Sequence, residues 1–183
     1  MFFFINDIMV QASRYNTKNE FLHDSWFLLM DRLGVKKTSH GYYRGLIRGY
    51  SEPKRFYHSL DHIVDCLNKF DKLKDEAENP NAVEAAIFFH DSIYHPDKKL
   101  NEEKSGVLAH IVMRELGLDE VFAYNVYELV LVTKHKKEPA SIDEKIIVDI
   151  DLSILGENAE RFDLYESNIR KEYKFMDINE FNE

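Results

Sequence analysis

The sequence predicts an all-α protein, folded as a single compact bundle of about seven to eight helices. Apolar residues recur at the three- and four-residue spacing of amphipathic helices through most of the 183 residues. Helix breakers are scarce, with 7 glycines and 4 prolines, and no alternating strand pattern of useful length occurs. A chain of this length with 44% hydrophobic residues can bury its own core, so we expect one domain over residues 1–183.

The first helix is predicted from a capping box. Thr17 precedes Glu20 by three residues, and an apolar stripe follows until Gly34 ends the helix. A shorter helix is expected over residues 42–50, and Pro53 prevents its continuation.

The next helices follow from apolar stripes and from terminal residues. Residues 60–73 carry a clear apolar face. Asn79 and Pro80 open a fourth helix, because proline suits the first helical turn, and its stripe continues to Tyr94. A fifth helix begins at Asn101 and ends at Gly117.

Three helices complete the bundle. Asp119 opens the sixth, which runs to about Lys134. Ser141 and Glu144 form a second capping box for the seventh, and an eighth covers about 157–175.

Composition narrows the function classes. A net charge of −9 argues against a nucleic-acid polymer as partner but leaves room for a small phosphorylated substrate. Cys66, the single cysteine, suits a reducing cytoplasm. The apolar start, residues 1–5, is too short for a signal peptide, and no stretch has the length of a membrane helix. We therefore expect a cytoplasmic protein without a membrane partner, and leave the oligomeric state open.

The chemistry of the chain lies in its histidines and aspartates. His58 and His62 are one helical turn apart, His90 and Asp91 are adjacent, and the seventh helix carries Asp151. Imidazole and carboxylate groups suit a divalent cation, and ligands from separate helices can converge inside a bundle. The sequence therefore predicts a metal site.

These motifs resemble those of the HD-domain phosphohydrolase superfamily, in particular a small bacterial group of predicted metal-dependent HD phosphohydrolases. The likeness covers about residues 53–173, with a metal-binding core over about 53–156. A more distant likeness is to the cyclic-nucleotide phosphodiesterases, which share the Tyr-His, the second His four residues on, the His-Asp and the Asp-Leu-Ser. The similar segments are Pro53-Lys54-Arg55-Phe56-Tyr57-His58, Phe89-His90-Asp91, Asn101-Glu102-Glu103-Lys104-Ser105, Asp151-Leu152-Ser153-Ile154-Leu155-Gly156 and Arg170-Lys171-Glu172-Tyr173.

The resemblance implies a fold, a ligand set and an activity. The fold is the HD-domain helical bundle. The metal ligands are His62, His90, Asp91 and Asp151, and the Asp-Leu-Ser motif favours Asp151 over Asp149 as the last of them. The cofactor is a divalent ion, Mn, Mg, Fe, Co, Ni or Zn. The activity is metal-dependent hydrolysis of a nucleotide or another small phosphate ester or anhydride by a metal-activated water.

Catalytic roles are assigned on the same basis. Asp91 or Asp151 helps to orient and deprotonate the water, with Asp91 named as the catalytic residue, and His58 protonates the leaving oxygen as general acid. Arg55 balances the developing charge, because a guanidinium binds phosphate oxygens through paired hydrogen bonds.

Further residues are candidates for substrate contact: Arg55, Asn101, Glu102, Lys104 and His135. Each has an ordinary alternative, namely an exposed surface arginine, first-turn helix residues, or a histidine that suits the helix dipole. His95, His110 and His135 could also supply extra ligands. Two other functions stay open: an HD-type di-iron oxygenase, which needs those extra ligands, and a non-catalytic metal- or nucleotide-binding regulatory domain.

Overall fold

The computed structural model describes residues 2–177, with side chains described from Thr17 onward. All regular structure in this part is helical, which confirms the all-α prediction. The elements are α1 (Phe2–Arg32), α2 (His40–Tyr50), α3 (Leu60–Leu73), η1 (Lys74–Glu76), α4 (Pro80–Phe89), α5 (Asn101–Glu115), α6 (Glu120–Val132), α7 (Ile142–Asp151), η2 (Leu152–Gly156) and α8 (Ala159–Glu172), where η denotes a short 3-10 helix.

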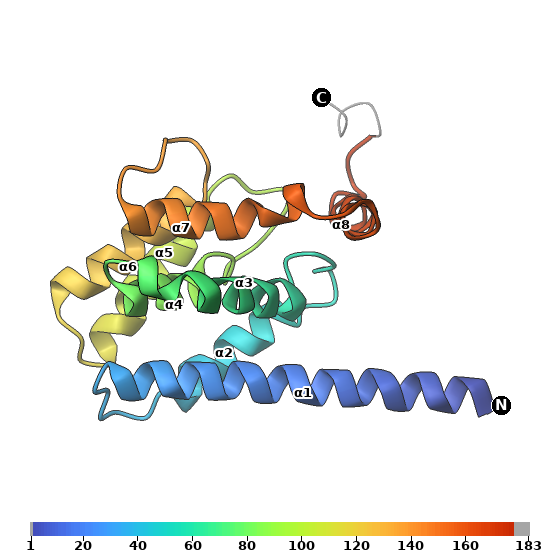
Figure 1. Cartoon of the computed structure of the whole chain (residues 1–183), viewed down its shortest axis with the longest axis horizontal. Helices are drawn as coiled ribbons and strands as arrows, with labels where there is room; N and C mark the ends of the chain where they lie inside the picture. Colours follow the sequence, from blue (N-terminus) through green and yellow to red (C-terminus); the bar gives the residue numbers. More distant parts are fainter. Residues whose placement is uncertain (1, 178–183) are drawn as a thin grey trace.

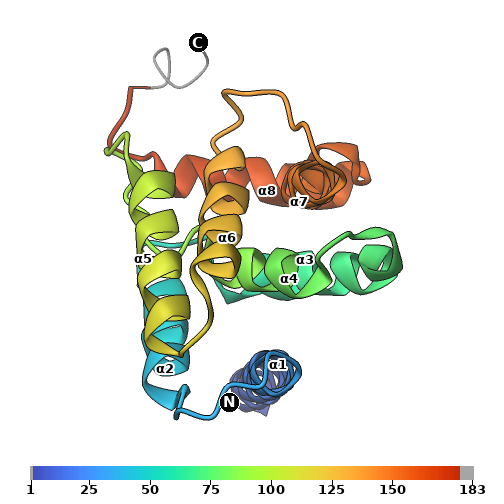
Figure 2. The same cartoon turned by 90° about the vertical axis from the view of Figure 1, so that its left-hand side faces the viewer.

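The helices form two crossed sets. Helix α1, the pair α3 and α4, and helix α7 lie in successive layers with similar axis directions (Figure 1). Helices α5 and α6 pack on each other and stand across these layers (Figure 2), while α8 lies beyond the end of α7. The middle layer, α3 and α4, contacts both α1 and α7. Within residues 2–177, no helix combines the length and apolar character needed to cross a bilayer.

Helix α4 is the centre of the hydrophobic core. Every residue from Ala82 to His90 is buried, and one apolar cluster includes residues of α1 to α7. A helix that is apolar on all sides must be surrounded by other helices. The histidine at its end therefore lies inside the molecule.

The caps predicted for three helices are confirmed. Ser141 accepts a hydrogen bond from the Glu144 N–H while the Glu144 carboxylate bonds back, so α7 starts at a complete capping box. The side chains of Asn79 and Asp119 accept backbone N–H groups at the starts of α4 and α6. These caps set where α4 and α7 begin, and hence where their last residues lie.

Three predicted boundaries were wrong. Helix α1 begins at Phe2, so Thr17 lies inside it and forms no cap; residues 2–16 contain no glycine or proline to stop the helix. Helix α8 is shorter than 157–175, because η2 precedes it and Asn158 caps it.

Helix α4 ends at Phe89, so Tyr94 is not on it. The physical reason is that the Arg55 guanidinium donates hydrogen bonds to the carbonyls of Asp91 and Ser92, which a continued helix would need for its own N–H groups. Those carbonyls thus bond outside any continuation of the helix.

Trp26 provides a test of the α1–α4 packing. Its side chain is fully buried, its indole N–H donates to Ser39 Oγ at 3.1 Å, and its ring meets Phe88 edge-on. Trp26→Ala should lower the free energy of unfolding by about 3–5 kcal/mol because it leaves a cavity. Leu28→Ala, on the exposed side of the same helix, should change it by less than about 0.5 kcal/mol. Urea denaturation measures both, and equal losses would contradict this packing.

Candidate metal centre

Helix α3 carries His62 on its buried face. The side chain is 3% exposed, and Leu60, Ile63 and Cys66 share this face. The amphipathic pattern of α3 turns this face toward α4 and α7, which both contact the helix. His62 therefore points into the space between the middle layer and α7.

The end of α4 sets the direction of His90. Its backbone N–H still bonds to the Ala86 carbonyl at 2.8 Å, and its ring Nδ1 lies 2.9 Å from the Ile87 carbonyl oxygen. Since a carbonyl only accepts, Nδ1 carries the proton and the neutral ring keeps its lone pair on Nε2. A hydrogen bond of this kind is how metal-binding histidines are usually oriented.

Asp91 and Asp151 enter from opposite sides. Asp91 follows His90, and its backbone N–H donates to the Tyr50 hydroxyl at 3.1 Å. Asp151 is the last residue of α7, and its Oδ2 lies 2.9 Å from Nε2 of His135. His135 adopts a positive φ of 54° in the turn after α6, which directs its ring toward α7. Asp149, the competing candidate, is exposed.

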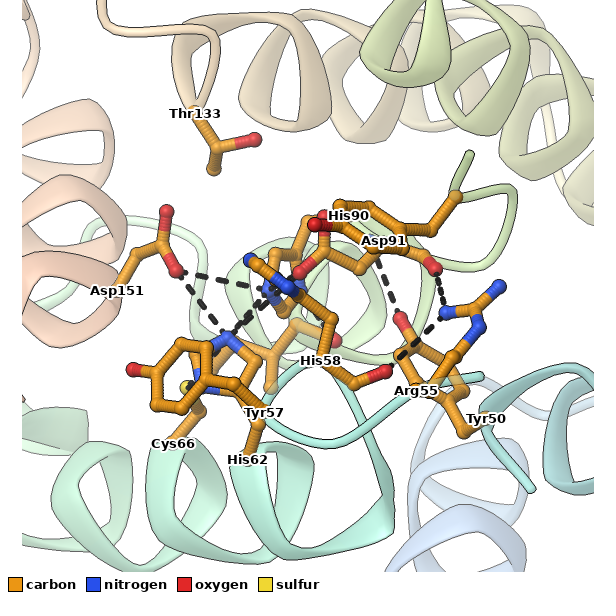
Figure 3. Close-up of polar contacts among 12 residues, drawn as sticks. Tyr50, Arg55, Tyr57, His58, His62, Cys66, His90, Asp91, Thr133 and Asp151 are labelled. Carbon is orange, nitrogen blue, oxygen red and sulfur yellow. Dashed lines mark hydrogen bonds and ion pairs between the residues drawn. The ribbon is translucent and has the colours of Figure 1, made fainter. Parts of the chain in front are cut away.

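The four predicted ligands meet at one point (Figure 3). Nε2 of His62 lies 2.9 Å from Nε2 of His90 and 3.2 Å from Oδ1 of Asp151. Oδ2 of Asp91 lies 3.2 Å from Nε2 of His90 and 3.8 Å from Nε2 of His62. Nε2 of His90 is 3.7 Å from Oδ1 of Asp151.

These separations match those between ligands of one small ion. Ligand atoms about 2.1 Å from an ion lie about 3.0 Å apart at octahedral angles and about 3.4 Å apart at tetrahedral angles. The imidazole and carboxylate atoms here span 2.9–3.8 Å. A divalent cation therefore fits this donor set in size, in ligand chemistry and in charge.

Without a metal, the cluster attracts protons. Burial lowers the pKa of His90, but the charge of Asp91 and its hydrogen bond outweigh it and raise that pKa to about 9. The pKa of His62 is likewise raised, despite burial, by Cys66 and Asp151. Burial alone would raise the pKa of both carboxyl groups, yet the histidines hold the pKa of Asp91 and Asp151 well below the usual range.

Cys66 is a neighbour that the sequence analysis did not connect with the site. It lies one turn after His62 on α3, is buried, and has its Sγ 3.7 Å from Nε2 and 3.8 Å from Nδ1 of His62. His62, Cys66 and His90 form a buried group that could bind a metal ion. The four-residue spacing from His62 was the available signal.

His58 lies beside the cluster but is held by a different partner. Its Nδ1 lies 2.6 Å from Oε2 of Glu172, and its ring stacks on Tyr94 at 4.1 Å between centroids. The Glu172 side chain is fully buried, and Oε1 accepts the backbone N–H groups of residues 56–58. Burial would raise the pKa of Glu172, but hydrogen bonding to His58 lowers it. Glu172 falls in a segment of the family resemblance, but no pattern in the sequence pairs it with His58, 114 residues away.

Arg55 lies underneath the site. Its side chain is 3% exposed, and it donates to the carbonyls of His58, Asp91 and Ser92. Its guanidinium also packs over the rings of Tyr50 and Tyr94. This position supports the loop that carries His58 and does not support the phosphate contact expected for Arg55.

The α5 candidates lie apart from the four ligands. Asn101 is buried and bonds through its amide to the backbone of His95 and Lys98, so it fastens the preceding turn. Glu102 is half-buried and Lys104 is exposed, both in the first turn of α5. Their placement fits ordinary helix-start positions as well as a pocket rim.

The other histidines divide into two groups. His135 contacts Asp151, as described above. His110 pairs with Glu120 at 2.9 Å, and His95 is exposed in the turn before α5. Only His135 of these three has a contact with one of the four ligands among the described residues.

The chain was compared with protein-family models, with curated proteins and with solved structures, and none of these matched it. The resemblance to HD phosphohydrolases thus stays a prediction from the sequence motifs.

The raised histidine pKa values predict how stability depends on pH. In metal-free protein, the bound proton stabilises the fold fully below about pH 6.5, and this contribution is lost as pH rises through about 9. We expect a loss of about 1–3 kcal/mol across that window. Saturating Mn²⁺ should remove the dependence, because the ion replaces the proton. Denaturation in chelator at a series of pH values tests this, and metal-free stability that stays level would contradict the cluster.

Proposed function

We propose that this protein is a metal-dependent phosphohydrolase acting on a nucleotide or another small phosphate ester or anhydride. The observation that carries the proposal is the meeting of His62, His90, Asp91 and Asp151, from three helix ends or turns, with imidazole and carboxylate atoms 2.9–3.8 Å apart. His58 stands beside them with a ring contact to His62. Donor set and adjacent histidine together suit hydrolysis better than simple metal storage.

The four residues would hold the ion, and their roles differ. A bound divalent cation supplies a positive charge that lowers the pKa of water and balances phosphate charge. Both oxygens of Asp151 have imidazole partners, in His62 and His135. Asp91 contacts the imidazoles through Oδ2, so we assign proton acceptance from the attacking water to Asp91.

His58 is assigned as general acid. Its Nδ1 is engaged by Glu172, which leaves Nε2 as the nitrogen that can give a proton to a leaving oxygen. The Glu172 carboxylate, held at Nδ1, sets the orientation of the ring. Glu172 is therefore a positioning residue and Arg55 a second one, since both hold the segment around His58.

Charge and ring contacts favour a small anionic substrate. Lys136 lies next to His135 in the turn that meets Asp151, within a chain of net charge −9, and its neighbours Lys134 and Lys137 pair with Glu103 and Glu144. On the other side of His62, the rings of Tyr57 and Tyr165 meet edge-on beside a cavity of about 180 Å³. Lysines for phosphate and flat rings for a base are the features that a nucleotide needs.

The di-iron oxygenase alternative has less support. It requires several further ligands, and of the three extra histidines only His135 reaches the cluster. A non-catalytic role would not explain why the His58 ring, held by Glu172, lies beside His62.

A phosphatase screen tests the proposal. Nucleotides and sugar phosphates are offered with Mg²⁺, Mn²⁺, Co²⁺ and Ni²⁺ added separately. We expect phosphate release that needs one of these ions, stops with chelator and returns on readdition. Absence of turnover with every ion, in protein that binds none of them, would overturn the proposal.

Substitution of the two neighbouring histidines separates their roles. His62→Ala should lower metal content and stability together, because ion binding contributes to the free energy of folding. His58→Ala should retain the metal and lower turnover by about 10²- to 10⁴-fold. The loss should be smaller for p-nitrophenyl phosphate, whose leaving group needs little protonation. Metal analysis of both variants, with their rates on the natural type of substrate and on p-nitrophenyl phosphate, tests these roles. Metal loss in His58→Ala alone would reverse the assignment.

Glu172→Gln tests the positioning role. The neutral amide holds Nδ1 of His58 less firmly than the carboxylate, so the ring should be less well oriented toward a leaving oxygen. Turnover should fall by about tenfold or more with metal content unchanged. Glu166→Gln, an exposed change on the same helix, is the control and should alter neither. The loss in Glu172→Gln should be smaller for p-nitrophenyl phosphate, and an equal loss on both kinds of substrate would indicate a merely structural role.

A further inference from the structure

A second pocket, of about 460 Å³, lies on the far side of Glu172 from His62. It opens between the loop after α2, the turn before α5 and the end of α8. None of the four proposed metal ligands lines it. Nothing in the proposed hydrolysis uses this pocket.

The pocket concentrates positive charge on an acidic protein. Lys54, Lys171 and Lys174 line it from two separate segments, together with His95. The two acidic residues in its lining are already engaged. Asp97 pairs with Lys98 at 2.6 Å, and the buried Glu172 carboxylate bonds to the 56–58 backbone, His58 and Tyr94. The lysines thus face the pocket without a competing free carboxylate in its lining.

The same pocket exposes two aromatic rings. Phe56 is 41% exposed and Phe175 is 56% exposed, and both line it. The Lys171 ammonium lies 5.8 Å from the Phe56 ring centroid, so charge and ring are adjacent. Exposed phenyl rings beside cations suit a ligand that has both a planar ring and an anionic group.

We propose that this pocket binds a phosphorylated aromatic small molecule of the nucleoside monophosphate class. The planar base lies against Phe56 and Phe175, and the phosphate lies among Lys54, Lys171 and Lys174. Binding at this site does not require a metal ion, because none of the four proposed metal ligands lines the pocket.

The pocket is connected to His58 through the Glu172 carboxylate. The Phe56 N–H donates to Oε1 of Glu172 at 2.6 Å, and Oε2 of the same carboxylate holds His58. A ligand that shifts Phe56 therefore acts on the carboxylate that orients His58. We expect ligand binding to change the NMR signals of the His58 ring.

The experiment measures binding of 5′-AMP by calorimetry to wild-type protein in chelator, so that no metal recruits the phosphate elsewhere. The double variant Lys171→Ala/Lys174→Ala should weaken binding by about tenfold or more, since each lysine–phosphate contact is charge-assisted. Phe175→Ala should weaken it by about fivefold or more through lost stacking. These side chains are exposed, and thermal unfolding verifies that each variant folds.

The matched control is Lys72→Ala/Lys145→Ala, which removes the same charge at exposed positions outside the pocket lining and should leave AMP affinity unchanged. Equal weakening in this control would show that AMP binding depends on overall charge and not on this pocket, and would overturn the proposal. Absence of binding at millimolar AMP would overturn it as well. Insensitivity to Phe175→Ala would reject the aromatic part. Because no turnover is measured, failure here is distinguishable from failure of the proposed hydrolase activity.

Discussion

Two imidazole rings and two carboxylates meet in the interior of the bundle, and this group needs a positive charge at its centre. Lone pairs and negative charges placed this close, away from water, repel one another unless a cation or protons lie between them. In the metal-free protein, protons take that role, as the raised pKa of His90 indicates. The surrounding fold is arranged so that α3, α4 and α7 each end or begin at this point.

Two buried charges support the loop between α2 and α3. Arg55 joins the carbonyl of His58 to those of Asp91 and Ser92, so it ties the segment of His58 to the turn that follows His90. Glu172 gathers the N–H groups of residues 56–58 from the opposite side. Buried charges that are held by several hydrogen bonds define one geometry, and removal of either leaves its partners unsatisfied. Helix α8 thus contributes to the site through one carboxylate, although most of that helix is exposed.

The sequence predicted the elements whose signals are local. The capping box at Ser141, the caps at Asn79 and Asp119, and the helical class follow from spacing and composition. The expectation that His62, His90, Asp91 and Asp151 meet rested on their order, on their positions on or beside predicted helices, and on the resemblance to the HD motifs.

The sequence did not predict features that depend on partners far away in the chain. Glu172 lies 114 residues from His58, and no local pattern joins them. Arg55 was expected to contact a phosphate because it lies three residues before His58. Its side chain is instead buried and donates hydrogen bonds to backbone carbonyls. Helix α1 begins at Phe2 and not at the predicted cap, Thr17, because no glycine or proline stops the helix between these positions. In each case tertiary contacts, or a missing stop, decided the outcome.

The absorption spectrum of Co²⁺ added to the metal-free protein tests the central claim most directly. Coordination by imidazole and carboxylate changes the d–d bands of Co²⁺ from those of the hydrated ion, and a thiolate ligand adds a charge-transfer band in the near ultraviolet. The account predicts altered d–d bands that saturate as Co²⁺ is added and are lost in His90→Ala. A spectrum that stays that of the hydrated ion at every ratio would contradict it.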